Sequence, residues 1–367
     1  MRARGSLAPP VRIPPPALFL VASALASDLV PALAPSVSRV ELVVTVALVV
    51  ILFDGGADIG WRRFRIAAVP IVSLGVPGTF ATAGLVTVFA HAVFGFGWLT
   101  AGLVGAAIAP TDPAVVFSVL GNHELRGRAR TILEGESGAN DPVGIALMLG
   151  LIALATHTDA TFWIVVRVFL EQIAIGLVVG LAGGLLERRL LRIGWLRTLV
   201  LVAVVYVLAD LAHGSGFLAV FVMGLVVGDI EAPSQSLQDR VASAAEIVAF
   251  VALGLTVHLS GIGWGRWGEG LALAAFLALV GRPLVAGALL MPARLDRGER
   301  LFVLWAGLKG AVPILLAAFA VTHHVHEAAR IYETVFVVVL ASVVVQGGTI
   351  PTAARRLAAT RPAARVA

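Results

Sequence analysis

Cysteine is absent from this chain of 367 residues. Its absence excludes a disulfide framework, thiol chemistry and any metal site built on cysteine. Charge is also scarce, because only 13% of the residues are Asp, Glu, Lys or Arg, against about 25% in a typical soluble domain. No polar stretch is long enough to form a separate soluble domain. These shortages indicate a single domain whose main solvent is lipid.

Apolar residues, in contrast, make up 59% of the chain. A helix needs about 20 apolar residues to cross a bilayer, and the runs here are long and lack the short alternation of a barrel strand. Twelve candidate segments follow one another: 16–34, 39–54, 66–93, 97–120, 128–157, 161–186, 195–212, 215–229, 240–260, 269–291, 300–322 and 330–352. The sequence therefore predicts an all-α polytopic membrane protein with about twelve transmembrane helices.

The net charge of +5 raises the question of nucleic-acid binding. However, the arginines form small groups between alternate apolar runs, as the positive-inside rule produces, and no basic stripe lies on an amphipathic face. With the N-terminus inside, 21 of the 27 basic residues fall in cytoplasmic segments and three in outer ones. This distribution predicts a multi-pass plasma-membrane protein with both termini in the cytoplasm, and no nucleic-acid partner.

We expect three parts along the chain: a cytoplasmic N-terminal segment (1–15), a transmembrane domain (16–352) and a short basic cytoplasmic tail (353–367). The N-terminus leaves an alternative open. Its basic start, short apolar core and "ALA" at 24–26 also resemble a cleaved secretory signal.

One apolar segment, "TILEGESGANDPVGIALMLG" (131–150), carries an unusual number of acids. At about 100° per residue, Glu134, Ser137 and Asp141 share one helix face, with Asn140 one step round. Carboxylate, hydroxyl and amide oxygens suit a hard cation, and the same carboxylate can take a proton instead. The pattern predicts a buried site that holds either a monovalent cation or H⁺, as an exchanger requires.

Two other segments are interrupted in mid-span. "AAIAPTDPAVVF" (107–118) places prolines around Thr111 and Asp112, and "WAGLKGAVPILLA" (305–317) places Gly and Pro around Lys309. Such interruptions release backbone groups that only a cavity can satisfy. We expect Asp112 to balance the positive helix ends and Lys309 the negative ones. One broken span in each half predicts an inverted-repeat transporter with its site at the midplane.

The remaining intramembrane charges are expected to have local partners. Arg282 cannot lose its proton and needs an anion; Glu136, about 140° round the helix from Asp141, is the predicted partner. Arg167 and Glu171 are four residues apart and are expected to pair. Asp54 precedes Gly-Gly and is expected to cap a helix end.

Together these segments resemble the cation/proton antiporter-1 family, the sodium/hydrogen exchangers of bacteria and their eukaryotic relatives. The motifs that carry the resemblance are "ILFDGG" (51–56), "APTDPAVVFSVL" (109–120), "EGESGANDPVGIAL" (134–147), "GRP" (281–283), "WAGLKGAVPI" (305–314) and "VQGGTIP" (345–351). They occur in family order over nearly the whole chain. "ESGANDP" looks closest to the potassium/proton, cell-volume-regulation branch.

The resemblance implies an inverted-repeat fold with two crossed discontinuous helices, a homodimer and elevator-like alternating access. It implies exchange of Na⁺ or K⁺ for H⁺, without a cofactor and without enzymatic activity. The Asn140–Asp141 pair marks electroneutral exchange. The residues implied at the site are Asp141, which binds cation or proton; Asn140, Ser137, Thr111 and Asp112, which help line it (Ser137 and Thr111 with Asp141 as Na⁺ or K⁺ ligands); and the bridge of Glu136 to Arg282.

Two departures from the family pattern stand out. The usual "GLRGA" reads "GLKGA", so Lys309 keeps the charge of the family's arginine but lacks its planar fork. Family members usually have thirteen helices and this chain is expected to lack the first, which bears on dimerisation.

Three other functions fit the sequence less well. A sodium-coupled symporter for an organic solute needs a further cluster of polar groups, which the sequence does not show. An ion channel would not need a protonatable site at the broken helices. An intramembrane aspartyl protease needs two carboxylates that share a proton, and only Asp210 and Asp229 could be assigned that role.

Overall fold

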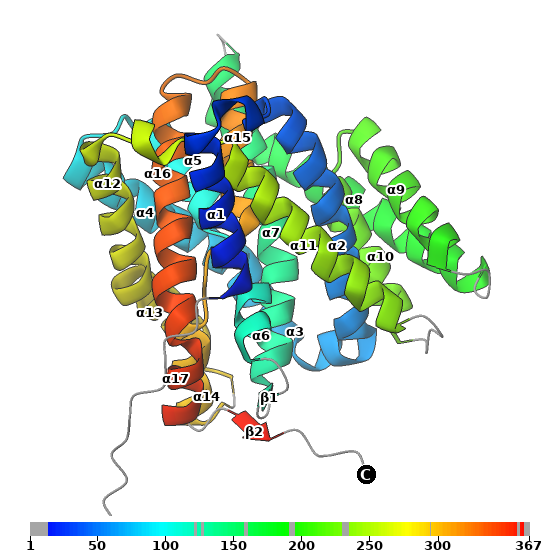
Figure 1. The fold of residues 1–367 in the computed structure, drawn as a ribbon. Coiled ribbons are helices and arrows are strands. Elements are labelled where there is room, and N and C mark those ends of the chain that lie inside the picture. The colour runs from blue at the N-terminus through cyan, green and yellow to red at the C-terminus, as the bar shows by residue number, and fades with distance from the viewer. Residues whose placement is uncertain are drawn as a thin grey trace, which may run out of the picture.

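The computed structural model describes residues 14–120, 123–125, 128–157, 161–190, 195–229, 235–293, 295–357 and 360–362. The predicted cytoplasmic segment or signal at the N-terminus lies mostly outside these residues. Every one of the twelve predicted segments is helical (Figure 1). The helices are α1 (Pro15–Leu29), α2 (Val37–Ile66), α3 (Ala68–Ser73), α4 (Thr79–Phe94), α5 (Trp98–Ile108), α6 (Ala114–Leu120), α7 (Ala129–Thr156), α8 (Phe162–Leu190), α9 (Trp195–Leu211), α10 (Gly216–Val227), α11 (Gln235–Leu255), α12 (Trp264–Phe276), α13 (Arg282–Leu289), α14 (Arg297–Trp305), α15 (Ala311–Thr322), α16 (Ala328–Ala341) and α17 (Gly348–Arg356).

Short turns join several of these helices. Three are π-helical and continue a span: η2 (Leu74–Gly78), η4 (Leu277–Gly281) and η5 (Ser342–Gly347). Two are 3₁₀ turns, η1 (Pro31–Leu33) and η3 (Leu259–Gly261). Within the described residues, six helical stretches are long and apolar enough to cross a membrane, and four shorter apolar helices accompany them. The figure of twelve crossings stays a prediction.

The two predicted interruptions are present. The chain leaves helical geometry between α5 and α6, at residues 109–113, and between α14 and α15, at residues 306–310. Pro110 and Pro113 in the first segment remove backbone donors, and Gly307 and Gly310 in the second weaken a helix. The amide of Asp112 donates to the carbonyl of Leu308 over 2.8 Å, so the two extended segments touch where they cross. Figure 1 shows α5 and α14 starting from opposite ends of the molecule.

One end of the molecule collects the arginines, and we call it the basic end. It lies at the bottom of Figure 1, where α7 and α14 begin and where α8 and α17 end. The described arginines there include Arg62, Arg63, Arg65, Arg128, Arg130, Arg188, Arg189, Arg297, Arg300, Arg355 and Arg356. The other end, where α7 ends and α8 and α16 begin, is called the opposite end.

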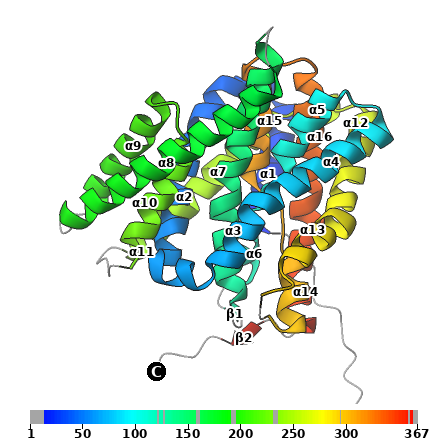
Figure 2. The same cartoon turned by 180° about the vertical axis from the view of Figure 1, so that it is seen from behind.

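The helices form two packed groups with α7 between them (Figures 1 and 2). On one side, α10 packs against α2 and α8, and α11 packs against α1 and α2. On the other side, α16 packs against α12 and α15, and α4 packs against α5. Helix α7 contacts α8 and α2 on one side and α5 on the other, so its polar face lies at the junction of the groups.

Glycines bring α2 and α10 into backbone contact. A Cβ atom on Gly224 would overlap the carbonyl oxygen of Phe53, and one on Gly228 would overlap the backbone of Ala57. Helix α2 kinks at Gly60, which has a φ of 63°, a conformation that favours glycine. The expectation that Asp54 caps a helix end is wrong: α2 continues through this residue to Ile66, and Gly56 lies against the backbone of Phe221 at the crossing with α10.

A two-stranded antiparallel sheet lies outside the apolar segments. β1 (His123–Leu125), between α6 and α7, pairs with β2 (Thr360–Pro362), which follows α17. Strands of three residues are too short to show an alternating pattern, so the sequence gives no signal for them.

Candidate functional site

The polar face of α7 borders a cavity of about 380 Å³ that extends toward the basic end. Glu134, Ser137 and Asp141 line it together, as their helical spacing predicts. Asp141 is 4% exposed. Its Oδ2 accepts a 3.4 Å hydrogen bond from the Ser137 hydroxyl, and its buried Oδ1 has no hydrogen-bond partner among the described residues. A buried carboxylate oxygen without a partner is costly, so a proton or a cation at Oδ1 would complete the site.

Asp112 lies where two helices begin. Its Oδ1 accepts from the amide of Ala114 in the first turn of α6 over 2.9 Å, and its carboxylate also hydrogen-bonds the backbone of Ala311, the first residue of α15. Gly310 leaves the space that this carboxylate occupies. The positive ends of both helices therefore meet one acid, and that acid also lines the cavity.

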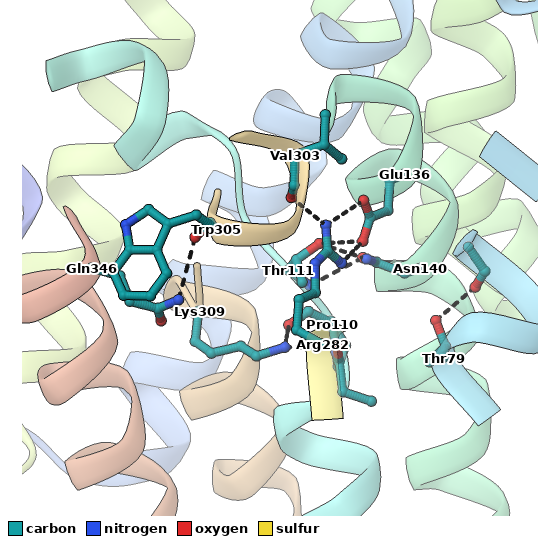
Figure 3. A network of polar contacts seen from close by, with 12 residues as sticks. Thr79, Pro110, Thr111, Glu136, Asn140, Arg282, Val303, Trp305, Lys309 and Gln346 are labelled. Atoms are coloured by element: carbon teal, nitrogen blue, oxygen red, sulfur yellow. Dashed lines mark hydrogen bonds and ion pairs between the residues drawn. The ribbon is translucent and has the colours of Figure 1, made fainter. Parts of the chain in front are cut away.

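Lys309 lies where α5 ends (Figure 3). Its Nζ donates to the carbonyls of Ala109 and Pro110, over 2.9 Å each, and the side chain is buried. These carbonyls follow the last turn of α5 and carry partial negative charge. The contact is the helix-end role expected for this lysine.

Two polar residues behind Lys309, Ser342 and Gln346, were not among the predicted site residues. The amide of Lys309 donates to the Ser342 hydroxyl over 2.9 Å, which donates to Oε1 of Gln346 over 2.7 Å. Gln346 donates in turn to the carbonyl of Trp305, at the end of α14 (Figure 3). Both residues belong to the π-helical turn η5, and such turns re-aim side chains at functional sites. The motif "VQGGTIP" (345–351), which contains Gln346, was the feature of the sequence that could have indicated these groups.

Arg282 pairs with Glu136 through both terminal nitrogens (Figure 3). Nη1 donates to Oε1 and Nη2 to Oε2, the latter over 2.8 Å. Nη2 also donates to the carbonyl of Val303 in the last turn of α14, over 3.2 Å. The structure thus places the arginine against the acid expected from helical geometry. It adds a contact that the sequence did not indicate, because Arg282 supports the end of α14 while Lys309 supports the end of α5.

Thr111 and Asn140 lie behind the cavity rather than in it. The Thr111 hydroxyl donates to Oε1 of Glu136 over 3.2 Å and accepts from Nδ2 of Asn140 over 2.8 Å. The Asn140 carbonyl oxygen accepts from the amide of Thr111 over 3.4 Å. The predicted site residues therefore form two sets. Asp112, Ser137 and Asp141 face the cavity, whereas Thr111, Asn140, Glu136 and Arg282 form a buried network beside it.

Small residues on α7 allow these close approaches. A side chain at Gly144 would overlap the ring of Pro110, and one at Gly138 would overlap the ring of Phe221 from α10. The extended segment between α5 and α6 can therefore lie directly against α7, which brings Thr111 within reach of Asn140.

Known proteins share much of this sequence. Residues 2–356 match the model of a family described as sodium/hydrogen exchanger, transmembrane. The K⁺/H⁺ antiporter NhaP of Alkalimonas amylolytica is 36% identical over 329 residues, which are 86% of this chain and 57% of that protein. The K⁺/H⁺ antiporter NhaP2 of Shewanella sp. strain ANA-3 is 35% identical over 332 residues, 87% of this chain and 58% of that protein. The chain thus spans less than two thirds of the length of these relatives.

A solved structure shows the same fold. The sodium proton antiporter MjNhaP1 of Methanocaldococcus jannaschii superposes with a TM-score of 0.78 at 22% identity, over 91% of this chain and 93% of that one. The fold is the all-helical one with two crossed, broken helices described above. Because the family match covers nearly the whole chain, the chain belongs to the transmembrane sodium/hydrogen exchanger family.

Proposed function

We propose that this chain is a secondary-active antiporter that exchanges Na⁺ or K⁺ for H⁺. The observation that carries the proposal is Asp141, which lines a cavity beside the crossing of two broken helices and whose buried Oδ1 has no hydrogen-bond partner among the described residues. A proton and a cation cannot occupy the same carboxylate oxygen together, so binding of one releases the other. The antiporter names of the relatives support this function.

Some of the surrounding residues offer ligands to the cation, and others hold the helices in place. Ser137 and Asp141 offer oxygen ligands to a cation that has shed water, and Asp112 adds negative charge to the cavity while it holds two helix ends. Thr111 and Asn140 fix the extended segment against α7. The bidentate pair of Glu136 and Arg282 keeps α7, α13 and α14 in register. We assign Thr111 a supporting role through its hydroxyl, which is already engaged on both sides.

The proposal also covers the domain, its membrane topology and its oligomeric state. The family is one of transporters. We propose that residues 16–352 form one transport domain in the plasma membrane, with the basic end and both termini in the cytoplasm. A homodimer in a lipid bilayer, alternating access to Asp141 and transport without a cofactor complete it.

The structure argues against a protease. Asp229 accepts from the amide of Arg62 at the basic end, whereas Asp210 lines a cavity at the opposite end. The twelve-residue helix α10 separates them, which is about 18 Å at 1.5 Å per residue. Two carboxylates so far apart cannot share a proton.

Proteoliposomes that hold the purified full chain and a pH-sensitive dye test the function. Addition of Na⁺ or K⁺ to acid-loaded vesicles should release protons, and Asp141→Asn should abolish the response because the amide cannot exchange a proton for a cation. Glu171→Gln, on an exposed side chain, should exchange normally and serves as the control. Cation-driven proton release that persists in Asp141→Asn would contradict the assignment.

A further inference from the structure

Three carboxylates in the described part of the chain have a buried oxygen without a hydrogen-bond partner. One is Asp141; the others are Glu41 on α2 and Glu246 on α11. Buried polar atoms in native proteins nearly always have partners, and an exception calls for an explanation. Neither Glu41 nor Glu246 belongs to the network around Asp141.

Glu41 lines a second cavity, of about 540 Å³, at the opposite end of the molecule. We call this the opposite chamber, and the cavity beside Asp141 the basic chamber. The polar lining of the opposite chamber is rich in oxygen and includes one histidine: Ser38, Glu41, Thr45, Gln172, Tyr206, Asp210, Ser215, Thr322 and His323. Carboxylate, hydroxyl and amide oxygens are the ligands of hard cations, so the chamber suits a partly hydrated cation.

The same four helices line both chambers, one after the other along their length. On α7, residues up to Asp141 line the basic chamber, and Ile145 and Leu149 line the opposite one. On α10, Phe221 lines the first and Phe217 the second, and α2 and α15 divide in the same way. Asp141 and Ile145 are four residues apart, or about 6 Å along a helix. The chambers therefore meet end to end near the level of Asp141.

Apolar side chains separate the chambers. Ile145, Phe217 and Phe319 line the opposite chamber and present no polar atom to a cation. A cation in that chamber is thus close to Asp141 along the axis, although Asp141 itself does not line the chamber. It needs a ligand of its own while it waits, and Glu41 offers a carboxylate oxygen that nothing else in the described residues binds.

Glu246 has the matching position in the basic chamber. It lines this cavity together with Asp112 and Asp141, but it comes from α11, which packs mainly against α1 and α2. Its Oε1 is the oxygen without a hydrogen-bond partner among the described residues. A carboxylate in a low-dielectric cleft raises the local concentration of cations.

We propose that Glu41 and Glu246 are loading sites for the transported monovalent cation, one in each chamber. Each holds the ion with part of its water before Asp141 takes it, and accepts it again after release on its own side. This inference rests on the proposed antiport function and extends it from one acid to three. If the proposal is right, each chamber has its own affinity for the cation, and a substitution in one chamber changes only the affinity measured from that side.

Kinetics measured from each side test the proposal. Right-side-out and everted membrane vesicles expose opposite chambers to the added cation. Glu41→Gln should raise the KM for that cation about tenfold on the side of the opposite chamber, which corresponds to about 1.4 kcal/mol. Glu246→Gln should raise it similarly on the side of the basic end. In each variant kcat and the KM on the other side should stay near the wild-type values.

Two sets of controls separate binding from folding. Glu41→Asp and Glu246→Asp keep a carboxylate and should restore most of the affinity. Glu171→Gln removes the same charge from a side chain that lines neither chamber and should leave both KM values unchanged. Unchanged KM values in Glu41→Gln and Glu246→Gln, or equal losses on both sides with reduced thermal stability, would overturn the proposal. Absence of cation-driven proton flux in the wild type would instead overturn the antiport function itself.

Discussion

Asp141 differs from the charged residues around it in what it binds. Arg282 forms an ion pair with Glu136, and Lys309 donates hydrogen bonds to two carbonyl groups. Asp112 accepts a hydrogen bond from a backbone amide at a helix N-terminus. Within the described residues, Asp141 accepts one hydrogen bond, from Ser137, and its Oδ1 has no partner. Ionised groups are expensive in a membrane and are retained for function. Arg282 keeps its Nε without a partner among the described residues, but its charge is paired with Glu136, whereas the carboxylate of Asp141 has no charged partner there, as the proposed ion site requires.

Removal of Arg282 tests the structural side of this contrast. Arg282→Ala leaves the carboxylate of Glu136, which is 2% exposed, without its main partner. Loss of one member of a buried pair costs roughly 3–5 kcal/mol. The midpoint of thermal unfolding, followed by tryptophan fluorescence, should therefore fall clearly.

A double variant and an exposed arginine provide the controls. Glu136→Ala together with Arg282→Ala removes the stranded charge and should recover part of the lost stability. Arg167→Ala breaks an exposed pair with Glu171 and should change little, because surface ion pairs contribute little. An Arg282→Ala protein as stable as the wild type would show that the bridge is dispensable.

At the scale of helices, the crossing is held by side chains that complement helix ends. Asp112 meets the beginnings of α6 and α15, Lys309 meets the end of α5, and Arg282 meets the last turn of α14. Four half-helix ends thus have charges of the appropriate sign. A half-helix cannot end inside a membrane unless its free backbone groups are bound in this way.

Replacement of Lys309 should loosen the end of α5. Lys309→Met keeps much of the volume but removes the donor to Ala109 and Pro110. Loss of a hydrogen bond to a charged group costs roughly 1.5–3 kcal/mol, so the variant should be less stable and exchange more slowly. Lys309→Arg keeps the charge and should recover most of both properties. Equal stability of Lys309→Met and wild type would refute the role.

The sequence predicts most of these elements because lipid leaves a chain few choices. Long apolar runs must be helices, and prolines around Thr111 and glycines around Lys309 mark the breaks. Helical angles alone placed Glu136 opposite the Asp141 face. The double engagement of the Thr111 hydroxyl was not predictable, because it depends on the path of an extended segment. The prediction for Asp54 was wrong because Gly56 serves a helix crossing and not a helix end.

At the scale of the whole molecule, a single acid at the junction of two chambers predicts neutral exchange. If Asp141 carries either one proton or one monovalent cation, the loaded site has the same charge in both directions. A complete cycle then moves no net charge across the membrane.

Transport under imposed membrane potentials checks this expectation. Exchange in proteoliposomes held at potentials of either sign should proceed at the same rate. Protein adsorbed on a supported membrane should show no net charge displacement when the cation is added. A rate that changes with potential, or a sustained current, would contradict one-for-one exchange.

The glycine contacts between α2 and α10 have a mechanical consequence. Where backbone rests on backbone, no layer of side chains remains that can repack to let one helix slide along the other. The two helices should therefore move together as one rigid unit. Helix α8 belongs to the same unit, because Gly176 and Gly180 bring it into backbone contact with Ser215 and Ala219. A change of shape that exposed Asp141 to the other face, as alternating access requires, would therefore have to occur along a different seam, with α2, α8 and α10 as its fixed part.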